Sequence, residues 1–174
     1  MSYKAHSNIK VMELQKQTMP LSLQPIAKNN YEAVCDLDVA KEQEEYVACN
    51  MWSLVEAQFN SGYETRAIYT EENPVGFLMW VRESHEKISI WRFMVDQKHQ
   101  GKGIGRAALQ LALQEIRQTP DIEQIEICYN PKNPVAKDFY SSFGFTEVGI
   151  DKDNEDMLAI INLTNKNPKE TDTI

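Results

Sequence analysis

A glycine-rich segment near the middle of the chain is the part of the sequence best suited to binding an anion. It reads Gln100-Gly101-Lys102-Gly103-Ile104-Gly105-Arg106. An apolar, strand-like stretch (88–95) precedes it, and a helix-favouring stretch (106–118) follows it. Glycines let backbone N–H groups approach a ligand closely, and the N-terminus of a helix adds positive potential there. The segment therefore predicts a site for a phosphate-bearing ligand, and the alternative is a glycine-rich turn that binds nothing.

Two common nucleotide-binding loops do not fit this segment. A Walker-type loop needs Ser or Thr directly after Gly-Lys to hold magnesium, and here Lys102 is followed by Gly103. A dinucleotide-binding fingerprint places its glycines earlier and adds an acidic residue about 20 positions further on. Glu123 and Glu126 are the acids in range, and both would be weak ribose ligands.

Length and composition predict an ordinary globular protein. The 174 residues suffice for one domain with a real core, and 42% of them are hydrophobic. No apolar run is long enough to span a bilayer, and the N-terminus lacks the basic-then-apolar pattern of a signal peptide. The three cysteines are widely spaced without a metal-ligand pattern, which fits reduced thiols. We therefore expect a cytoplasmic protein with no metal and no membrane partner.

The charge balance bears on the class of ligand. With 26 acidic and 18 basic residues, the formal net charge is −8. A nucleic-acid partner would favour a basic face, so none is expected. An acidic protein is compatible with a cationic substrate, although acidity also serves solubility alone.

Apolar periodicity and turn residues divide the chain into alternating elements. We expect a domain over residues 20–163, between a polar N-terminal extension (1–19) and a polar C-terminal tail (164–174). The element order is β-α-α-β-β-β-α-β-α-β-β, which predicts a mixed sheet with helices on its faces. The expected strands are 21–25, 66–70, 75–81, 88–95, 122–129, 145–150 and 157–163, and the expected helices are 31–37, 52–59, 106–118 and 134–143.

Two spaced motifs resemble the GNAT superfamily of acetyl-CoA-dependent N-acetyltransferases. The first combines Arg92-Phe-Met-Val-Asp96 with the glycine-rich segment, in which Gln100, Gly103 and Gly105 match the family pattern Gln/Arg-x-x-Gly-x-Gly/Ala. The second is Asn133-Pro-Val-Ala136 followed by Tyr140. The resemblance covers roughly residues 21–163. It implies an α/β (α+β) GNAT fold, whose mixed sheet of about seven strands splays apart at its centre and has helices on both faces.

Within the superfamily, the chain looks most like bacterial spermine/spermidine (diamine) N-acetyltransferases. The cues are Trp91-Arg-Phe-Met-Val-Asp96, the start of the glycine-rich segment, and Glu45-Tyr-Val-Ala-Cys-Asn50 with Ser53-Leu54. The resemblance implies acetyl transfer to a primary amine of a polyamine, and a homodimer. The open alternatives are another acceptor (a diamine, an aminoglycoside or a protein N-terminus) and a non-catalytic acetyl-CoA-binding sensor.

The resemblance also implies where acetyl-CoA binds. Its pantetheine arm would add like a strand to the freed backbone after residue 92, and the amides of the glycine-rich segment would hold the pyrophosphate. Lys102 and Arg106 can pair with phosphates, or they simply face solvent. The implied cofactor-binding residues are Phe93, Met94, Val95, Gln100, Gly101, Lys102, Gly103, Ile104, Gly105, Arg106, Asn133, Ala136, Lys137 and Tyr140.

Aminolysis of a thioester sets three requirements for catalysis. An alkyl ammonium of pKa ~10.4 is neutral about once in 2,500 at pH 7, a cost near ~4.6 kcal/mol, so a base must take its proton. A backbone N–H at Met94 or Val95 is the natural oxyanion donor. The leaving thiolate needs a proton, and by analogy with the family Tyr140 supplies it. The alternative for Tyr140 is a core aromatic, because apolar residues recur at helical spacing around it.

The acceptor site is predicted from acidic residues on two links between elements. Convergent carboxylates suit a polyamine, although each one alone fits a solvated surface charge. Trp91 and Arg92 occupy positions where some polyamine enzymes of the superfamily carry acids, which puts a simple carboxylate base there in doubt. His85 and His99 are expected at the surface. The predicted substrate-binding residues are Glu42, Glu44, Glu45, Glu83 and Trp91.

Overall fold

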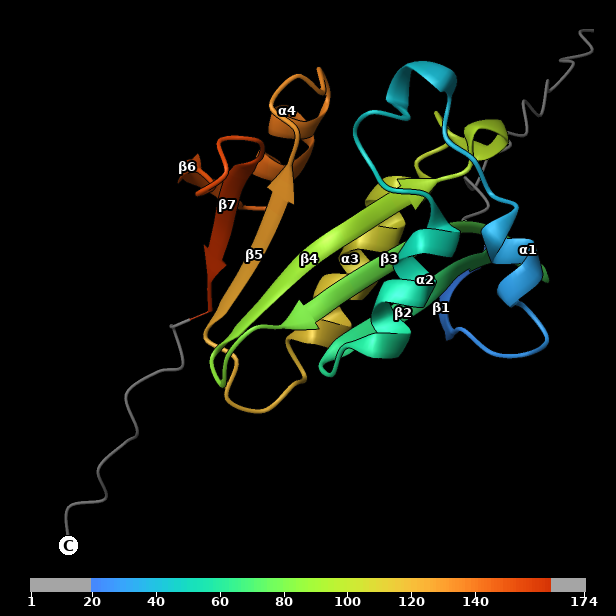
Figure 1. Ribbon diagram of the computed structural model, residues 1–174, viewed down its shortest axis with the longest axis horizontal. Coiled ribbons are helices and arrows are strands. Elements are labelled where there is room, and N and C mark those ends of the chain that lie inside the picture. Colours follow the sequence, from blue (N-terminus) through green and yellow to red (C-terminus); the bar gives the residue numbers. More distant parts are fainter. Residues whose placement is uncertain (1–19, 164–174) are drawn as a thin grey trace, which may run out of the picture.

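The computed structural model describes residues 20–163, which form one mixed sheet with helices on both faces (Figure 1). The strand order within this part of the chain is β1-β2-β3-β4-β5-β7-β6, and all neighbours are antiparallel except β4 and β5, which run parallel. The expected fold class and element order are confirmed. The strands are β1 (Leu21–Pro25), β2 (Tyr63–Thr70), β3 (Asn73–Arg82), β4 (Lys87–Val95), β5 (Gln124–Tyr129), β6 (Thr146–Ile150) and β7 (Met157–Asn162).

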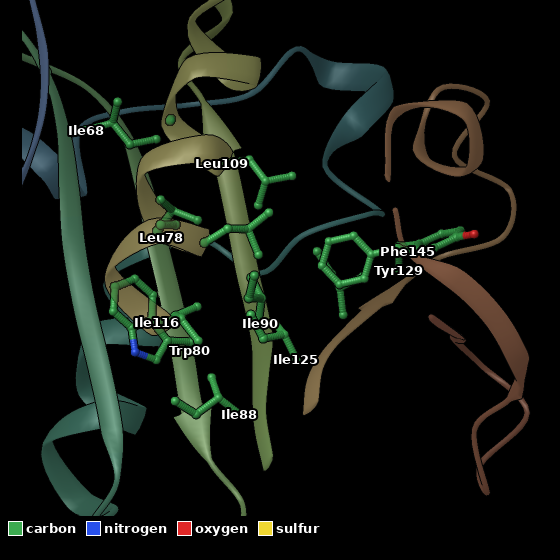
Figure 2. Close-up of a cluster of buried hydrophobic side chains, with 14 of the residues drawn as sticks. Ile68, Leu78, Trp80, Ile88, Ile90, Leu109, Ile116, Ile125, Tyr129 and Phe145 are labelled. Carbon is green, nitrogen blue, oxygen red and sulfur yellow. The ribbon is translucent and has the colours of Figure 1, made fainter. Parts of the chain in front are cut away.

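Helices cover the two faces of the sheet unequally. Helix α3 packs on one face through apolar residues at helical spacing, such as Ala108, Ala112 and Ile116, and this interface forms the larger core (Figure 2). Helices α1 and α2 lie on the opposite face over β2 and β3, where Phe77 and Met79 are fully buried. The helices are α1 (Tyr31–Cys35), α2 (Asn50–Phe59), α3 (Ile104–Ile116) and α4 (Ala136–Ser141), with 3-10 turns η1 (Lys41–Gln43) and η2 (Gln97–His99).

The predicted separation of β4 and β5 is present. The two strands pair only from Lys87 opposite Gln124 to Ile90 opposite Ile127, and beyond that point they diverge (Figure 1). A β-bulge marks the change, because Trp80 pairs with Ile90 whereas the preceding Met79 pairs with Arg92, which leaves Trp91 as the extra residue. Bulges increase local twist and bend the strand that contains them. The end of β4 therefore stays paired with β3 but has an open edge toward β5.

Element boundaries differ modestly from those expected. Strands β2 and β3 are longer, so Pro74 belongs to β3 and the hairpin turn shrinks to residues 71–72. Helix α3 begins two residues earlier, at Ile104, and α4 is shorter than the expected 134–143. The proposed N-terminal extension and C-terminal tail lie outside the described residues. Within residues 20–163, no helix combines the length and apolar character needed to cross a membrane.

Candidate functional site

A cavity of about 470 Å³ opens where β4 and β5 separate. The end of β4, the N-terminus of α3 and the α4 region form three of its walls, and the loop between α1 and α2 contributes a fourth. Most of the predicted cofactor residues meet here, although they come from segments about forty residues apart. Those lining it are Phe93, Met94, Val95, Gln100, Gly101, Gly103, Ile104, Gly105, Arg106, Asn133, Ala136 and Tyr140.

The glycine-rich segment leads into the N-terminus of α3 through a left-handed turn. Gly103 is the N-cap of α3 and has φ +81°, in the left-handed region. The amide of Ala107 donates the first intrahelical hydrogen bond, to the carbonyl of Gly103. The three preceding amides, on Ile104, Gly105 and Arg106, therefore have no acceptor within the helix. They face the N-terminal end of α3, where the helix dipole favours a negative charge.

Replacing Gly103 by Ala should strain this turn without a steric clash. A Cβ atom at Gly103 would meet no atom of the described part of the chain within 4 Å, so the cost is conformational, about 1–2 kcal/mol for a left-handed non-glycine residue. We expect G103A to lower the free energy of unfolding by about that amount and to weaken acetyl-CoA binding by about tenfold. Urea denaturation and calorimetric titration measure the two effects. An unchanged affinity would show that the loop binds no phosphate.

The side chain of Gln100 joins two loops rather than facing a ligand alone. Its Nε2 donates to the carbonyl of Val95 at 2.8 Å and to Oε1 of Gln43 at 2.9 Å. Gln43 lies on η1, and its Oε1 also accepts the amide of Ala40 at 3.1 Å. Gln100 thus links the glycine-rich segment to the loop between α1 and α2. Sequence reasoning missed Gln43, because nothing local indicates that it reaches a segment 57 positions away.

Asp96 and His99 strengthen the same link. The carboxylate of Asp96 is buried and accepts the amides of Asp38 and Lys98, at 3.3 and 3.1 Å. His99 Nδ1 lies 3.0 Å from Asp96 Oδ2. Burial opposes ionisation, but these hydrogen bonds outweigh it and lower the pKa of Asp96. His99 was expected at the surface and is instead half-buried, as part of the cavity wall.

The three predicted cationic residues differ in their placement. Arg106 lines the cavity, with its guanidinium 4.9 Å from the ring centre of Phe143 and hydrogen-bonded to Ser142 Oγ. Lys102 lies outside the cavity wall and donates to the carbonyl of Lys98. Lys137 also lies outside it, paired with Glu147 at 2.8 Å. Arg106 is therefore the cation best placed for a phosphate.

Tyr140 stands in an aromatic cluster at the far side of the cavity. Its ring centre lies 5.3 Å from that of Tyr129 and 5.2 Å from that of Phe139, so it is both a packing residue and a cavity residue. No hydrogen bond reaches its hydroxyl from any of residues 20–163. Burial, with smaller effects from Cys128 and Tyr129, raises the pKa of Tyr140 well above its ordinary value. The hydroxyl is therefore held in its protonated form.

Asn133 and Ala136 support the cavity wall beside Tyr140. The Asn133 side chain accepts the amide of Val135 at 3.2 Å, which fixes the turn before α4. Ala136 is buried and is the first residue of that helix. Both residues line the cavity.

A second cavity, of about 690 Å³, adjoins the first. Trp91, Cys128 and Tyr129 line both, so the two spaces meet at the separation of β4 and β5. Within residues 20–163, no three His, Cys, Asp or Glu residues are grouped so as to hold a metal ion. The charged residues of the second cavity are Glu44, Glu45, Arg92, Lys132, Glu155 and Asp156.

The predicted acceptor residues fall into two groups. Glu44, Glu45 and Trp91 line the second cavity. Glu42 and Glu83 do not; Glu42 is exposed on η1, and the Glu83 carboxylate accepts from Trp91 Nε1 at 3.1 Å and pairs with Lys87. Although burial acts in the opposite direction, these contacts lower the pKa of Glu83. Glu83 thus braces Trp91 instead of facing the cavity.

Arg92 places a cation at the edge of the second cavity. Its Nη2 lies 3.3 Å from Glu56 Oε2, and its Nη1 donates to the carbonyl of Trp91. Its Nε is buried and has no hydrogen-bond partner among residues 20–163. The ion pair offsets part of the positive charge. Sequence reasoning did not anticipate three further residues of this cavity that bear on chemistry: Cys128, Glu155 and Asp156.

Comparisons with known proteins identify a family for this chain. Residues 31–145 match the acetyltransferase (GNAT) family. The chain is 27% identical over 134 residues to the spermine/spermidine N(1)-acetyltransferase of Bacillus subtilis (strain 168), covering 73% of this chain and 88% of that protein. A probable spermine N(1)-acetyltransferase of Bacillus subtilis subsp. natto matches equally well.

Two solved structures share the fold. The spermidine N-acetyltransferase of Vibrio cholerae, in complex with CoA and spermine, superposes with a TM-score of 0.67 at 16% identity, covering 82% of this chain and 95% of that one. The PaiA N-acetyltransferase of Thermoplasma acidophilum, in complex with coenzyme A, gives 0.62 at 16% identity, covering 83% and 99%. At such identities these likenesses concern the fold alone.

Proposed function

Because this chain belongs to the acetyltransferase (GNAT) family, we propose that it transfers the acetyl group of acetyl-CoA to a primary amine of spermine or spermidine. The observation that carries the proposal is the pair of adjoining cavities, one with free helix N-terminal amides and one with acidic walls. The amides suit the pyrophosphate of CoA, and the acids suit a cationic acceptor.

The backbone of β4 supports the proposed placement of the cofactor. Its last residues are paired with β3 on one side only, so a pantetheine arm would complete the open edge toward β5. A thioester at the end of that arm would lie beside Met94 and Val95. The N–H of Asp96 donates to Val75, and N–H groups alternate sides along a strand, so the N–H of Met94 also faces β3. The amide of Val95 faces the open edge and is the proposed oxyanion donor for the tetrahedral intermediate.

The acidic walls support a polyamine as the acceptor. Four carboxylates line the second cavity, from Glu44, Glu45, Glu155 and Asp156, against two cations, Arg92 and Lys132. A polyamine has several ammonium groups, so remote ones can bind the walls while one end reaches the thioester. The curated relatives that act on spermine and spermidine favour the same acceptor.

The test is release of CoA from acetyl-CoA, followed by thiol detection, with a panel of amines at pH 8. We expect turnover with spermine or spermidine, and little with a diamine, an aminoglycoside or a peptide with a free N-terminus. Turnover with only one of the other amines would support acetyl transfer but would show that the acceptor is not spermine or spermidine. Tight acetyl-CoA binding without turnover on any amine would favour a non-catalytic sensor.

Neutralising the acidic wall should weaken polyamine binding selectively. The double variant Glu44→Gln/Glu45→Gln removes two charges from the second cavity, and each exposed contact is worth about 0.2–1 kcal/mol, so KM for spermine should rise about 2- to 30-fold. The difference should shrink at high salt. Glu71→Gln/Glu72→Gln, in the exposed β2–β3 turn, makes the same charge change and should leave KM unaltered. Equal KM values for both double variants would exclude these acids from binding.

Compartment and assembly complete the proposal. Cys35, Cys49 and Cys128 are free thiols, as suits a reducing compartment, and we propose a cytoplasmic enzyme. A homodimer is proposed from the family resemblance, and light scattering of the purified chain measures its mass directly.

A further inference from the structure

Asp156 lines the second cavity, close to the end of β5. It precedes β7, whose first residue, Met157, pairs with Tyr129 at the end of β5. This register sets Asp156 beside the point at which β5 leaves β4, and its side chain helps to line the second cavity. Asp156 belongs to the turn between β6 and β7, about 25 residues after the end of β5 in sequence.

Cys128 connects Asp156 to Tyr140. Cys128 lines both cavities, and after burial the charge of Asp156 is the main influence that raises the pKa of its thiol, to about 11. Cys128 in turn contributes to the raised pKa of Tyr140. Asp156 and Cys128 both line the second cavity, and Tyr140 and Cys128 both line the first. An amine bound beside Asp156 and a thioester bound beside Tyr140 would therefore come together next to Cys128.

The other carboxylates near this point are already engaged or exposed. Glu56 pairs with Arg92, whereas Glu83 and Glu126 both pair with Lys87. Glu44, Glu45 and Glu155 line the cavity but are exposed. Asp156 is half-buried, and no side-chain hydrogen bond from residues 20–163 engages its carboxylate. Among these acids, it is the one whose carboxylate is both partly shielded from water and free to bind an ammonium group.

The surroundings of Asp156 make it a better base than an ordinary aspartate. Burial raises its pKa, and the charges of Asp151 and Glu155 raise it further, while Arg92 opposes them. A higher pKa lowers the cost of taking a proton from an ammonium group, provided that the carboxylate stays ionised at working pH. The charged and titratable groups that share its surroundings are Glu44, Glu45, Tyr46, Arg92, Cys128, Tyr129, Lys132, Asp151 and Glu155.

We propose that Asp156 binds the reacting ammonium group of the acceptor and takes its proton. This inference rests on the acetyl transfer proposed above and names the base of that reaction. The neutral amine then attacks the thioester carbonyl carbon and the C–N bond forms, which leaves the nitrogen positively charged. This nitrogen gives its second proton to water as the C–S bond breaks. The sulfur gains a proton from Tyr140, and Asp156 and Tyr140 return to their starting states by exchange with solvent. The sum is ammonium plus acetyl-CoA giving amide, CoA thiol and one proton.

The test compares Asp156→Asn with the wild type over pH 6 to 10. The variant is nearly isosteric but cannot take the proton, so kcat at pH 7 should fall about 10²- to 10³-fold. The diagnostic readout is the pH profile. Wild-type kcat should be nearly flat above the pKa of Asp156, whereas the kcat of the variant should rise about tenfold per pH unit toward the amine pKa near ~10.4. Asp156→Glu should restore part of the activity, with a flat profile.

Two controls separate this inference from the function on which it rests. Asp153→Asn, in the same turn but exposed and outside the cavity wall, should keep the wild-type rate and profile. Acetyl-CoA affinity should be equal in all variants. If the wild type turns over an amine and Asp156→Asn has the same kcat and profile, Asp156 is not the base. If the wild type acetylates no amine, the proposed function itself fails, and the inference fails with it.

Discussion

Replacement of Tyr140 by Phe is expected to lower kcat for acetyl transfer by about 10²- to 10³-fold while leaving acetyl-CoA affinity within about twofold. The ring packs against Tyr129 and Phe139, and Phe keeps those contacts. What disappears is a hydroxyl that makes no hydrogen bond to residues 20–163 and belongs to a residue of the cavity wall. The variant therefore isolates proton donation to sulfur from aromatic packing.

The raised pKa of Tyr140 bears on how it would act. A phenol that resists ionisation is a weak acid, but the apolar surroundings that disfavour tyrosinate also disfavour the CoA thiolate leaving beside it. If Tyr140 donates its proton while the C–S bond breaks, no free thiolate is left in these apolar surroundings, and the charge is not concentrated on either oxygen or sulfur. Since Tyr140 stays protonated well above pH 10, its ionisation should not produce an alkaline fall in kcat below that pH.

Steady-state kcat with the best amine, together with calorimetric titration of acetyl-CoA, measures both halves of this prediction. Tyr129→Phe is the matched control, because its hydroxyl is already occupied by donation to Glu147 Oε1 at 2.7 Å. We expect that variant to keep kcat within about threefold. Unchanged turnover in Y140F would remove Tyr140 from the acid role and leave it a core aromatic.

Local chemistry made the turn and the helix start of the proposed cofactor site predictable from sequence. Positive φ at Gly101 and Gly103, and the start of α3 directly after them, depend on residues next to one another in the chain. The second motif behaves similarly, because Asn133 fixes the turn that starts α4 and Tyr140 follows on that helix. Because such features depend on residues at fixed spacing, a sequence motif is enough to predict them.

The acceptor half depends on contacts between distant segments, and there the prediction was partial. Glu44 and Glu45 were anticipated, but Asp156 enters through the pairing of β7 with β5, which no local pattern indicates. Glu83 was expected at the acceptor site and instead braces Trp91, since the bulge at that residue changes which side chains face the cavity. Bulge positions and sheet register are tertiary outcomes that single residues do not encode.

Gly76 is another residue whose role depends on tertiary contacts that its sequence neighbours do not indicate. Gly76→Ala should be severely destabilising. No motif contains this residue, yet it pairs with Val95 in the strand that flanks the cavity. A Cβ atom there would lie 2.5 Å from the carbonyl oxygen of Met94 and 2.7 Å from Ile68 Cδ1. The backbone of β4 cannot yield as a flexible side chain would. We expect the free energy of unfolding to fall by about 2–4 kcal/mol.

The sign of the change in the free energy of unfolding distinguishes a steric clash in the folded state from the usual effect of Gly→Ala on the unfolded chain. A compatible Gly→Ala substitution stabilises by about 0.4–1 kcal/mol, because alanine restricts the unfolded chain. Gly105→Ala is the matched control, since a Cβ atom there would lie 3.7 Å from its nearest neighbours and within a helix. Urea denaturation should therefore move the midpoint down for G76A and up or not at all for G105A. A stable G76A protein would show that β4 can shift, and acetyl-CoA affinity would then report how far Met94 and Val95 had moved from the proposed thioester position.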